Sequence, residues 1–473
     1  MTDTSQRLIV VSNRLPIVVS EENGQWRVSP GSGGLVTALA PVLRQRGGVW
    51  IGSPGTPPEA SVDSLLEEVS QREGYTLRPV ALEEDLIKGY YGGFSNEILW
   101  PLFHDMLGRC NFEPGHWEPY REANRRFAQV IARETQPDDF VWVQDYHLLL
   151  VGEALHGMGV GRRCGFFLHI PFPPPDIFRR LPWRRDIIQG MLRYRLLGFH
   201  TEHDRRNFLR TVRAVIPEAR VESRRRTSIV TLGDLVTRVG AFPIGIDFDQ
   251  FQGTAKTHEV DESAWLFHEN LPNRKIILGV DRLDYTKGIR RRLRAFMLFL
   301  EQHPEFHKHV SLVQVVVPSR VDVPEYQAIK RQLDEMVGHI NGKFSYEGWV
   351  PVHYEFRSIP FVQLIGAYRA SEICLVTPLR DGMNLVAKEY CASHIDNRGV
   401  LILSEFAGAA AQLKIGAIMV NPNDIVGIAD AIHQALTMDE EEKVARMKRM
   451  RVEVRRNDVH RWAASFLRAA DLD

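Results

Sequence analysis

The sequence predicts an α/β protein made of two doubly wound domains, each with a largely parallel sheet covered by helices. Three observations lead to this fold class. The chain has 473 residues, which is too long for one hydrophobic core and suits two domains of about 200 to 250 residues. Short apolar runs alternate with helical segments along most of the chain, as in βαβ units. Glycines and polar side chains follow many of these runs, where ligands bind in open α/β sheets.

In the first half of the chain, five short apolar runs are predicted to be buried strands. They are Leu8–Val11, Val49–Gly52, Phe140–Val143, Gly165–His169 and Leu197–His200. The helical segments between them indicate parallel strands joined by crossovers.

The second half repeats this pattern after a seam near Ala241–Asp247, where Pro243 and Gly245 interrupt the chain. We therefore expect an N-terminal domain over residues 1–240 and a C-terminal domain over residues 241–455. Residues 456–473 are expected to form a helix that packs back on one domain, the N-terminal one being the first candidate. The strands expected in the second domain are Ile276–Val280, Val313–Val317, Ile373–Val376, Val400–Leu403 and Ala417–Val420.

The balance of charges argues against a polyanionic partner. The chain has 59 basic and 59 acidic residues, so its formal net charge is zero. A surface that coats nucleic acid normally needs an excess of Lys and Arg. We therefore expect small-molecule partners and no nucleic acid, with any phosphate held by a few local residues. Composition leaves open whether the chain forms homo-oligomers.

The cysteines and the N-terminus bear on the compartment. Cys110, Cys164, Cys374 and Cys391 form no CxxC pair, which favours free thiols in a reducing compartment. The sequence shows neither a signal peptide nor a membrane-spanning segment. We therefore expect a cytoplasmic protein without a membrane partner.

The most informative stretch is Thr377–Tyr390, directly after the predicted strand Ile373–Val376. Asp381 can accept hydrogen bonds from sugar hydroxyls, and so can Glu389 in the helix that follows. The N-terminus of that helix offers free N–H groups and a positive dipole end to an anion. The stretch therefore suits a ligand with both hydroxyls and phosphates. The alternative is an ordinary strand–turn–helix connection with a capping Asp.

A second stretch, Asp281–Gly288, follows the first predicted strand of the second domain. It places Arg282 and Lys287 at the start of a helix, where two fixed cations can stabilise a diphosphate leaving group. Arg320 is a further cation at a strand end. The alternative for single cations is a solvated surface. We assign that role to two runs, Arg224–Arg226 and Arg290–Arg292.

The first domain has phosphate-binding signals of its own. Arg14 follows the first predicted strand and can contact a phosphate in a bidentate manner. A glycine-rich turn, Gly31–Leu35, leads into a helix whose N-terminus can hold phosphate. Gly34 in this turn allows the backbone to approach a ligand closely. Because tight turns also need glycine, the turn alone does not decide between binding and folding.

Four more side chains of the first domain are candidates for a sugar-phosphate pocket. Tyr91 and Trp100 are aromatics with polar tips, although packing in the core explains each of them more simply. Asp145 follows a predicted strand and can either bind hydroxyls or cap a helix. His169 precedes a stiff proline loop, and it is either a contact of the reacting sugar or a satisfied core histidine.

Motifs for several other chemistries are absent from the sequence. There is no P-loop, HExxH or GxSxG motif, and no cluster of metal ligands at a recognisable spacing. Asp247-Phe248-Asp249 is similar to the nucleophile motif of haloacid-dehalogenase-type phosphatases, but the Gly-Thr that should follow is missing. We therefore expect no metal and no cofactor.

Three stretches, His169–Pro173 (HIPFP), Asp281–Gly288 (DRLDYTKG) and Thr377–Tyr390 (TPLRDGMNLVAKEY), resemble those of trehalose-6-phosphate synthases. The resemblance runs from about Leu8 to Trp462. It implies a retaining glycosyltransferase of the GT-B fold, with two Rossmann-like domains facing a cleft, the N-terminal one for the acceptor and the C-terminal one for the nucleotide sugar. The implied reaction moves glucose from a nucleoside-diphosphate glucose, usually UDP-glucose, to glucose 6-phosphate and gives α,α-trehalose 6-phosphate.

The resemblance also implies a role for each candidate residue. The acceptor phosphate is assigned to Arg14, Tyr91, Trp100 and Arg320, and the acceptor hydroxyls to Asp145. The donor diphosphate is assigned to Gly34, Arg282 and Lys287, and the donor glucose to His169 and Asp381. The sugar and phosphates are also assigned to the amides of Met383, Asn384, Leu385 and Val386. The ribose is assigned to Glu389. Catalysis is assigned to Arg282, Lys287, His169 and Asp381, by a front-face route without a metal or a covalent nucleophile. UDP-glucose would be a substrate and not a cofactor.

Three positions depart from the family pattern as we expect it. Gly92-Gly93 replaces a more polar pair, Gln412 stands where we expect a Glu, and Asn423 stands where a Tyr often follows Asn-Pro. These departures keep the reaction class but leave the donor base open between UDP, GDP and ADP.

Two alternatives to this function stay open. One is a neighbouring transferase on the same fold, such as glucosylglycerol-phosphate synthase or a C–N coupling enzyme. The presence of the acceptor residues above favours a sugar-phosphate acceptor instead. The other is a catalytically silent sugar-phosphate sensor, and the presence of Arg282, Lys287 and Asp381 argues against it.

Overall fold

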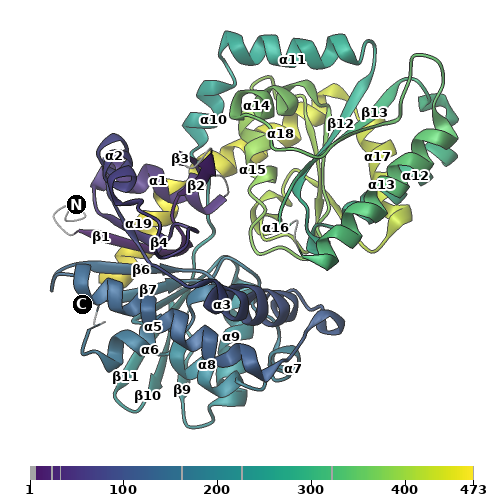
Figure 1. Cartoon of the computed structure of the whole chain (residues 1–473). Helices are drawn as coiled ribbons and strands as arrows, with labels where there is room; N and C mark the ends of the chain where they lie inside the picture. The colour runs from purple at the N-terminus through teal and green to yellow at the C-terminus, as the bar shows by residue number, and fades with distance from the viewer. Residues whose placement is uncertain are drawn as a thin grey trace. The chain divides into compact units, whose positions relative to one another are not determined.

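The computed structural model describes residues 7–22, 25–31, 34–160, 163–224, 227–320 and 323–471. The chain divides into two compact units (Figure 1). The first unit is Met1–Ile244 together with Val459–Asp473, and the second is Gly245–Asp458. For comparison, the sequence predicts a seam between residues 240 and 241 and a last segment that begins at residue 456.

The first unit is built on a nine-stranded sheet with the order β5-β4-β1-β6-β7-β8-β11-β10-β9. Neighbouring strands from β5 to β11 pair in parallel, whereas β10 and β9 add in antiparallel fashion. In chain order these strands are β1 (Leu8–Arg14), β4 (Val49–Ser53), β5 (Thr76–Pro79), β6 (Phe140–Gln144), β7 (Cys164–Phe167), β8 (Leu196–Phe199), β9 (Arg220–Glu222), β10 (Thr227–Leu232) and β11 (Leu235–Ala241). A separate hairpin consists of β2 (Ile17–Glu22) and β3 (Gln25–Pro30).

The winding of this sheet places its candidate site residues. From β1 the chain moves outward to β4 and β5, and it then returns to β6 on the other side of β1. Ligands of open α/β sheets bind outside the carboxyl ends of the strands at such a switch point. Arg14 ends β1 and Asp145 directly follows β6, so both lie at the edge where ligands are expected.

The C-terminal helix α19 (Val459–Asp471) belongs to the first unit. The ring of Phe466 stacks on the ring of Trp142 in β6, with centroids 4.6 Å apart. The centroid of the Trp462 ring lies 4.9 Å from that of Trp142. The last helix therefore contributes core residues to the first sheet. The other long helices of this unit are α1 (Gly34–Arg46), α2 (Asp63–Glu73), α5 (Trp117–Glu134) and α9 (Glu202–Val215).

The second unit is built on a six-stranded, entirely parallel sheet with the order β14-β13-β12-β15-β16-β17. In chain order its strands are β12 (Lys275–Arg282), β13 (Val310–Val317), β14 (Val352–Glu355), β15 (Ile373–Val376), β16 (Val400–Ser404) and β17 (Ile418–Val420). Its longer helices are α11 (His258–Asn270), α12 (Ile289–Gln302), α13 (Pro324–Phe344), α14 (Phe361–Ala370), α15 (Val386–Ser393), α17 (Ile425–Thr437) and α18 (Glu440–Arg456). The winding reverses between β12 and β15, so the stretches 281–288 and 377–390 flank this switch point.

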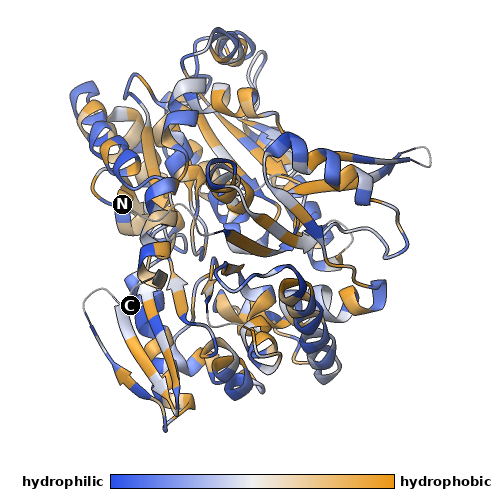
Figure 2. Cartoon of the chain, turned by 90° about the vertical axis from the view of Figure 1, so that its left-hand side faces the viewer, coloured by the Kyte–Doolittle hydropathy of each residue, from blue (hydrophilic) through white to orange (hydrophobic). Residues whose placement is uncertain are grey.

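The predicted fold class is confirmed: the protein is of the α/β class, and each unit is a Rossmann-like layer of largely parallel strands with helices. The strands are mainly coloured as hydrophobic in Figure 2, as expected for strands that are buried on both faces. Within the described ranges, no helix combines the length and the apolar character needed to cross a bilayer.

Candidate functional site

The end of β1 holds Arg14 in a defined position. The hydroxyl of Ser12 donates to the Arg14 carbonyl at 2.6 Å, and the indole N–H of Trp50 donates to the Ser12 hydroxyl at 2.8 Å. The Arg14 side chain passes over Gly55, where an added Cβ would lie 1.7 Å from the guanidinium. The guanidinium itself is exposed. It is therefore a fixed cation at a strand end that an anionic ligand can reach.

Tyr91 lies in a π-helix over Lys88–Leu99, a rare element that recurs at functional sites. Its ring stacks on His147 with centroids 5.5 Å apart and planes at 11°. Its carbonyl accepts a 2.6 Å hydrogen bond from the Asn96 amide, whose oxygen accepts from the Tyr146 hydroxyl at 2.9 Å. These contacts fix the half-buried ring of Tyr91 beside the residues that follow β6.

Trp100 follows the π-helix and is only 6% exposed. Its ring lies 4.2 Å from His104 and 5.6 Å from Tyr146, measured between centroids. The structure therefore places Trp100 in an aromatic core cluster. Its assigned contact with the acceptor phosphate stays a prediction.

Asp145 adopts a strained backbone with φ 72° and ψ 167°. A non-glycine residue in this conformation persists only when its surroundings enforce it, and such residues cluster at binding sites. The Asp145 N–H donates to the Phe167 carbonyl at 2.8 Å, and its carboxylate accepts from the His169 N–H at 3.2 Å. The carboxylate makes no capping bond to the short helix that follows, so the helix-cap alternative does not explain this residue.

His169 is 3% exposed, and burial lowers the pKa of its imidazole to about 3. The ring is therefore neutral near pH 7. Its Nε2 lies 2.9 Å from the Gln144 amide oxygen, and the Gln144 amide nitrogen donates to the Trp142 carbonyl at 3.3 Å. We assign the ring proton to Nε2 on this network. Nδ1 is then a buried acceptor, and it has no partner within the described part of the chain.

In the second unit, the end of β12 gathers three cations around Asp284. The buried Asp284 carboxylate accepts from the N–H and the hydroxyl of Thr286, both at 2.9 Å. Burial raises the Asp284 pKa, but the charges of Arg320, Arg282 and Lys287 and the Thr286 hydrogen bond outweigh that effect and leave the pKa below its ordinary value. Asp284 is thus an anion that stabilises a cluster of positive charge at the strand end.

Arg320 is connected to the same cluster. Its guanidinium donates to the Tyr326 hydroxyl and lies 5.3 Å from the centroid of that ring. The Tyr326 hydroxyl in turn lies 3.4 Å from the Asp284 carboxylate. The structure therefore brings Arg320 together with Arg282 and Lys287. Its assigned contact with the acceptor phosphate stays a prediction.

The loop after β15 is pinned on both sides. The Lys287 ammonium pairs with the Asp381 carboxylate at 2.5 Å. The same carboxylate accepts hydrogen bonds from the Met383 N–H at 3.1 Å and from the Asn384 side-chain amide at 3.2 Å. The Asp381 N–H donates to the Phe406 carbonyl at 3.1 Å. Because Asp381 binds Lys287 and its own loop, it is more than the capping residue of a strand–turn–helix connection.

Asn384 and the start of α15 complete this loop. Asn384 has φ 62°, and its buried side-chain oxygen has no partner among the described residues. α15 begins at Val386 and presents its first N–H groups at the same edge of the sheet. The segment Met383–Val386 therefore presents polar groups at this edge of the sheet, and its assigned contact with sugar and phosphates stays a prediction.

Glu389 and Lys388 are two poorly solvated charges on α15. The Tyr368 hydroxyl donates to the Glu389 carboxylate at 2.8 Å, and burial raises the pKa of Glu389 to about 7. Lys388 is buried, its ammonium donates to the Gln412 amide oxygen, and burial lowers its pKa to about 8. Gln412, which departs from the expected family pattern, is thus the neutral partner of a buried ammonium.

Comparison with known proteins decides the family. The model of "Glycosyltransferase family 20" matches residues 6–471 of this chain. The chain belongs to glycosyltransferase family 20. The family-20 enzymes it is similar to include the trehalose-6-phosphate synthase of Mycolicibacterium vanbaalenii, with 45% identity over 98% of this chain and 95% of that protein. A bifunctional trehalose-6-phosphate synthase/phosphatase of Thermoproteus tenax is 44% identical, and the chain spans 63% of its length.

Solved structures of family-20 enzymes share the fold. The α,α-trehalose-phosphate synthase (UDP-forming) of Burkholderia xenovorans in complex with glucose-6-phosphate has a TM-score of 0.90 and 36% identity, over 98% of this chain and 100% of that one. The E. coli enzyme bound with UDP-2-fluoro glucose has a TM-score of 0.87 and 36% identity, over 99% and 100% of the two chains. This family-20 chain is therefore a glycosyltransferase with the GT-B fold.

One arginine of this family-20 enzyme was wrongly predicted from its sequence. Arg292 in α12 is not part of a solvated run, because its side chain is 0% exposed. Its guanidinium pairs with the buried Asp281, donates to the Gln314 amide oxygen at 3.1 Å and donates to the Thr377 hydroxyl at 3.0 Å. It thereby ties the ends of β12, β13 and β15 beneath the two site loops. The available signal was helical spacing, since Ile289, Leu293 and Phe296 share its buried face.

The first unit contains two glycine-rich stretches among the predicted residues. α1 begins at Gly34, as the turn predicts, but Ser32 and Gly33 lie outside the described residues. The role of Gly34 at the donor diphosphate stays a prediction. In the π-helix, a Cβ on Gly93 would lie 2.3 Å from the His116 ring, whereas Gly92 has open space around it. The close approach of His116 explains one of the two unexpected glycines.

Proposed function

We propose that this chain transfers glucose from UDP-glucose to glucose 6-phosphate with retention of configuration and forms α,α-trehalose 6-phosphate and UDP. The observation that carries the proposal is the cluster of Arg282, Lys287 and Arg320 around Asp284, joined to Asp381 at the switch point of the second sheet. The Burkholderia relative supports the substrate pair, since it is described as UDP-forming and in complex with glucose-6-phosphate.

In this proposal the cation cluster stabilises the leaving group. The bond between the glucose C1 and the diphosphate oxygen breaks, and its electron pair leaves with the phosphate. Arg282 and Lys287 are proposed to meet that growing negative charge, and the Lys287 ammonium is already held by Asp381 before the reaction begins. The N–H groups at the start of α15 add the positive end of a helix dipole. These fixed charges are the reason to propose a reaction without a metal ion.

The acceptor hydroxyl then bonds to C1 from the face that the diphosphate leaves. Its proton passes to the leaving phosphate oxygen, so charge and atoms balance without a protein base. His169 does not supply a proton, because it is neutral and its Nε2–H is engaged by Gln144. We assign it instead to accept a hydrogen bond from a glucose hydroxyl at Nδ1.

The remaining roles are proposed from the resemblance to trehalose-6-phosphate synthases. Arg14 and Tyr91 are proposed to bind the acceptor phosphate, and Asp145 to bind acceptor hydroxyls. Asp381 and the Asn384 oxygen are proposed to bind the donor glucose, and Glu389 the ribose. Arg320 is proposed to contact the acceptor phosphate as well.

We also propose that the enzyme works in the cytoplasm on small-molecule substrates alone. All four cysteines are free thiols, and Cys164, Cys374 and Cys391 are buried. Buried free thiols support a reducing compartment.

A substrate matrix tests the proposed function. The chain is incubated with UDP-, GDP- or ADP-glucose and with glucose 6-phosphate or glycerol 3-phosphate, and the products are measured by mass spectrometry. We expect a trehalose phosphate product from UDP-glucose and glucose 6-phosphate. A product with glycerol 3-phosphate alone would favour glucosylglycerol-phosphate synthase. Stabilisation by glucose 6-phosphate without consumption of any donor would favour a silent sensor.

A further inference from the structure

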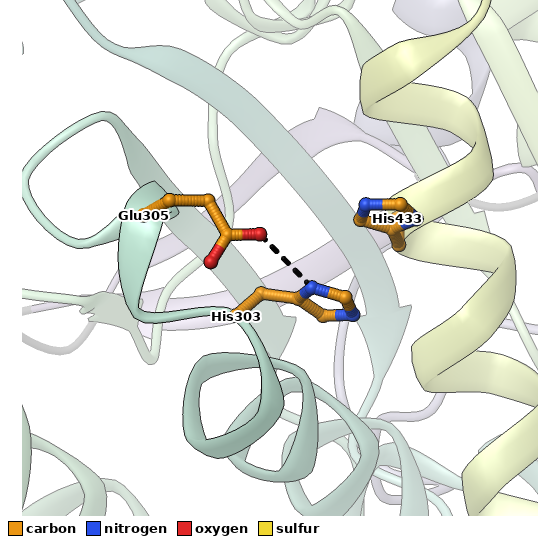
Figure 3. A group of neighbouring side chains, drawn as sticks. All are labelled: His303, Glu305 and His433. Atoms are coloured by element: carbon orange, nitrogen blue, oxygen red, sulfur yellow. Dashed lines mark hydrogen bonds and ion pairs between the residues drawn. The ribbon is translucent and has the colours of Figure 1, made fainter.

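Three side chains of the second unit meet away from the strand ends described above. His303 directly follows α12, Glu305 lies in the turn Pro304–Phe306, and His433 lies near the end of α17 (Figure 3). Both helices run back along the sheet from loops at the carboxyl ends of β12 and β17. Their C-terminal ends therefore lie at the opposite edge of the sheet from the site loops.

The three side chains lie close together. One nitrogen or oxygen atom of each lies within 4.8 Å of the others, and this is the one group of metal-ligating type found within the described ranges. His303 Nδ1 lies 3.1 Å from a Glu305 carboxylate oxygen. The rings of His303 and His433 face each other with centroids 4.1 Å apart and planes at 11°.

The chemistry of this group suits a transition-metal ion. Two imidazoles and one carboxylate form a donor set typical of zinc with an open fourth position. Calcium and magnesium prefer oxygen ligands throughout.

We propose that His303, Glu305 and His433 bind a zinc ion that ties the end of α12 to α17. Phe299 lies 5.4 Å from the His303 ring and Phe306 lies 5.8 Å from the His433 ring, so apolar side chains border the two imidazoles. Atoms bound to one tetrahedral zinc at 2.0–2.1 Å are about 3.4 Å apart. Binding therefore requires small side-chain rotations that bring the three atoms closer and separate the stacked rings.

The bound ion would link two helices at a place separate from the proposed chemistry. α12 starts directly after Lys287 and carries Arg292, so anchoring its far end to α17 stabilises the unit that holds the donor residues. An ion that binds the folded chain alone raises its unfolding temperature by mass action. The proposed transfer reaction does not depend on this ion.

The test is zinc titration of the untagged full chain after treatment with EDTA and removal of the chelator. Calorimetry should show one zinc per chain, and His433→Gln should weaken binding more than tenfold. At a free zinc concentration of 100 times Kd, the unfolding temperature of the parent should rise by about 3 °C if the whole chain unfolds together and by about 6 °C if the second unit unfolds alone. The rise should be lost in the variant.

The chain offers a matched control. His258 lies on α11 with Glu262 at 3.2 Å, which is also a His–Glu pair but has no second histidine in its group. His258→Gln should bind zinc as the parent does. Glu305→Gln, an exposed change in a turn, serves as a second variant if His433→Gln does not fold, and it should also weaken binding. Absence of binding by the parent, or equal binding by the parent and the Glu305→Gln or His433→Gln variant, would overturn the proposal.

Discussion

At the scale of single residues, burial decides what His169 can do. A buried, neutral imidazole with its proton directed at Gln144 can accept a hydrogen bond but cannot act as an acid. The position of His169 in the sequence suggested a catalytic residue. Its buried environment leaves it the role of positioning the substrate. The same principle applies to Glu389, where burial raises the pKa to about 7 and keeps part of the carboxyl protonated near neutral pH.

His169 should make the protein sensitive to acid. The unfolded chain takes up a proton near pH 6.5, whereas the native imidazole does so near pH 3. Between these values the unfolded state binds more protons, so native stability falls as the pH decreases. At pH 5 the loss from this residue is about 2 kcal/mol relative to pH 8. His169→Gln should lack that part of the loss in urea unfolding at both pH values. An equal loss in both proteins would contradict the assigned pKa.

Arg282 should matter for turnover and little for folding. Its side chain is exposed at the end of β12, and it is proposed to meet the charge that develops on the leaving diphosphate. Arg282→Ala should lower kcat by about 100- to 1000-fold, as removal of one fixed donor to a developing anion does. Steady-state kinetics and circular dichroism check activity and fold together.

Arg290→Ala is the matched control for this change, because Arg290 is an exposed arginine at the start of α12. Its kcat should stay within about twofold of the parent, as expected of a surface substitution away from special features. Near-parental turnover of Arg282→Ala would remove Arg282 from the leaving-group role.

Whether a single residue could be predicted depended on the kind of sequence pattern in which it lies. The sequence indicated Lys287 and Asp381 only as residues at two strand ends, and the structure pairs their side chains because they follow adjacent strands of one sheet. Arg292 was misjudged because three consecutive arginines suggest a wet surface, and only the helical phase shows that one of them points inward. The group of His303 and His433 gave no sequence signal, because 130 residues separate the two histidines (433 − 303 = 130).

At the scale of elements, the π-helix Lys88–Leu99 is the least expected feature. Its three glycines, Gly89, Gly92 and Gly93, lower helix propensity, and a sequence pattern does not distinguish an i→i+5 helix from an ordinary one. A side chain at Gly93 would meet the His116 ring, so sterics explain the glycine there. They do not explain the glycine at position 92. β9–β11 were also not predicted, because their inner and outer residues alternate and they contain no long apolar run.

Substitution of Gly92 and of its neighbour Gly93 in this helix should have opposite outcomes. Gly92→Ala meets no atom within 4 Å and should be neutral or stabilise the fold by up to about 1 kcal/mol. Gly93→Ala meets the His116 ring and should destabilise the fold by about 1 to 3 kcal/mol. Thermal unfolding of both variants checks this, and destabilisation of the same size in both would contradict the packing described here.

The junction of β12, β13 and β15 can be tested through its buried ion pair. Arg292→Met leaves the Asp281 carboxylate buried without its partner and should destabilise the fold by about 3 to 5 kcal/mol. Arg292→Met combined with Asp281→Asn should recover a large part of that loss. Urea unfolding of the single and double variants measures the coupling between the two residues. Additive losses would mean that the pair is not coupled.

At the scale of the whole molecule, the sheet of each unit has one switch point, and residues of the candidate site lie there. The sequence predicted both sheets from alternating strands and helices, since this pattern is local. It left the destination of the last helix open, because the aromatic residues of α19 show an apolar face but not the surface that covers it. Contacts of Phe466 and Trp462 with Trp142 place that helix in the first unit.

Fixed protein cations predict a reaction that tolerates chelators. With Arg282, Lys287 and Arg320 supplying positive charge, transfer at 25 °C should proceed at an unchanged initial rate in EDTA. The zinc proposed at His303 should affect the unfolding temperature and leave this rate alone. Loss of activity in EDTA that a divalent ion restores would show that the cation cluster is not sufficient.

The central claim is retaining transfer of glucose to glucose 6-phosphate. The most direct measurement is a proton NMR spectrum of the product formed from UDP-glucose and glucose 6-phosphate in the presence of EDTA. We expect both anomeric protons of the disaccharide phosphate to have the α configuration and one UDP to appear per product. A β-configured linkage, or UDP release with free glucose as the main product, would contradict it.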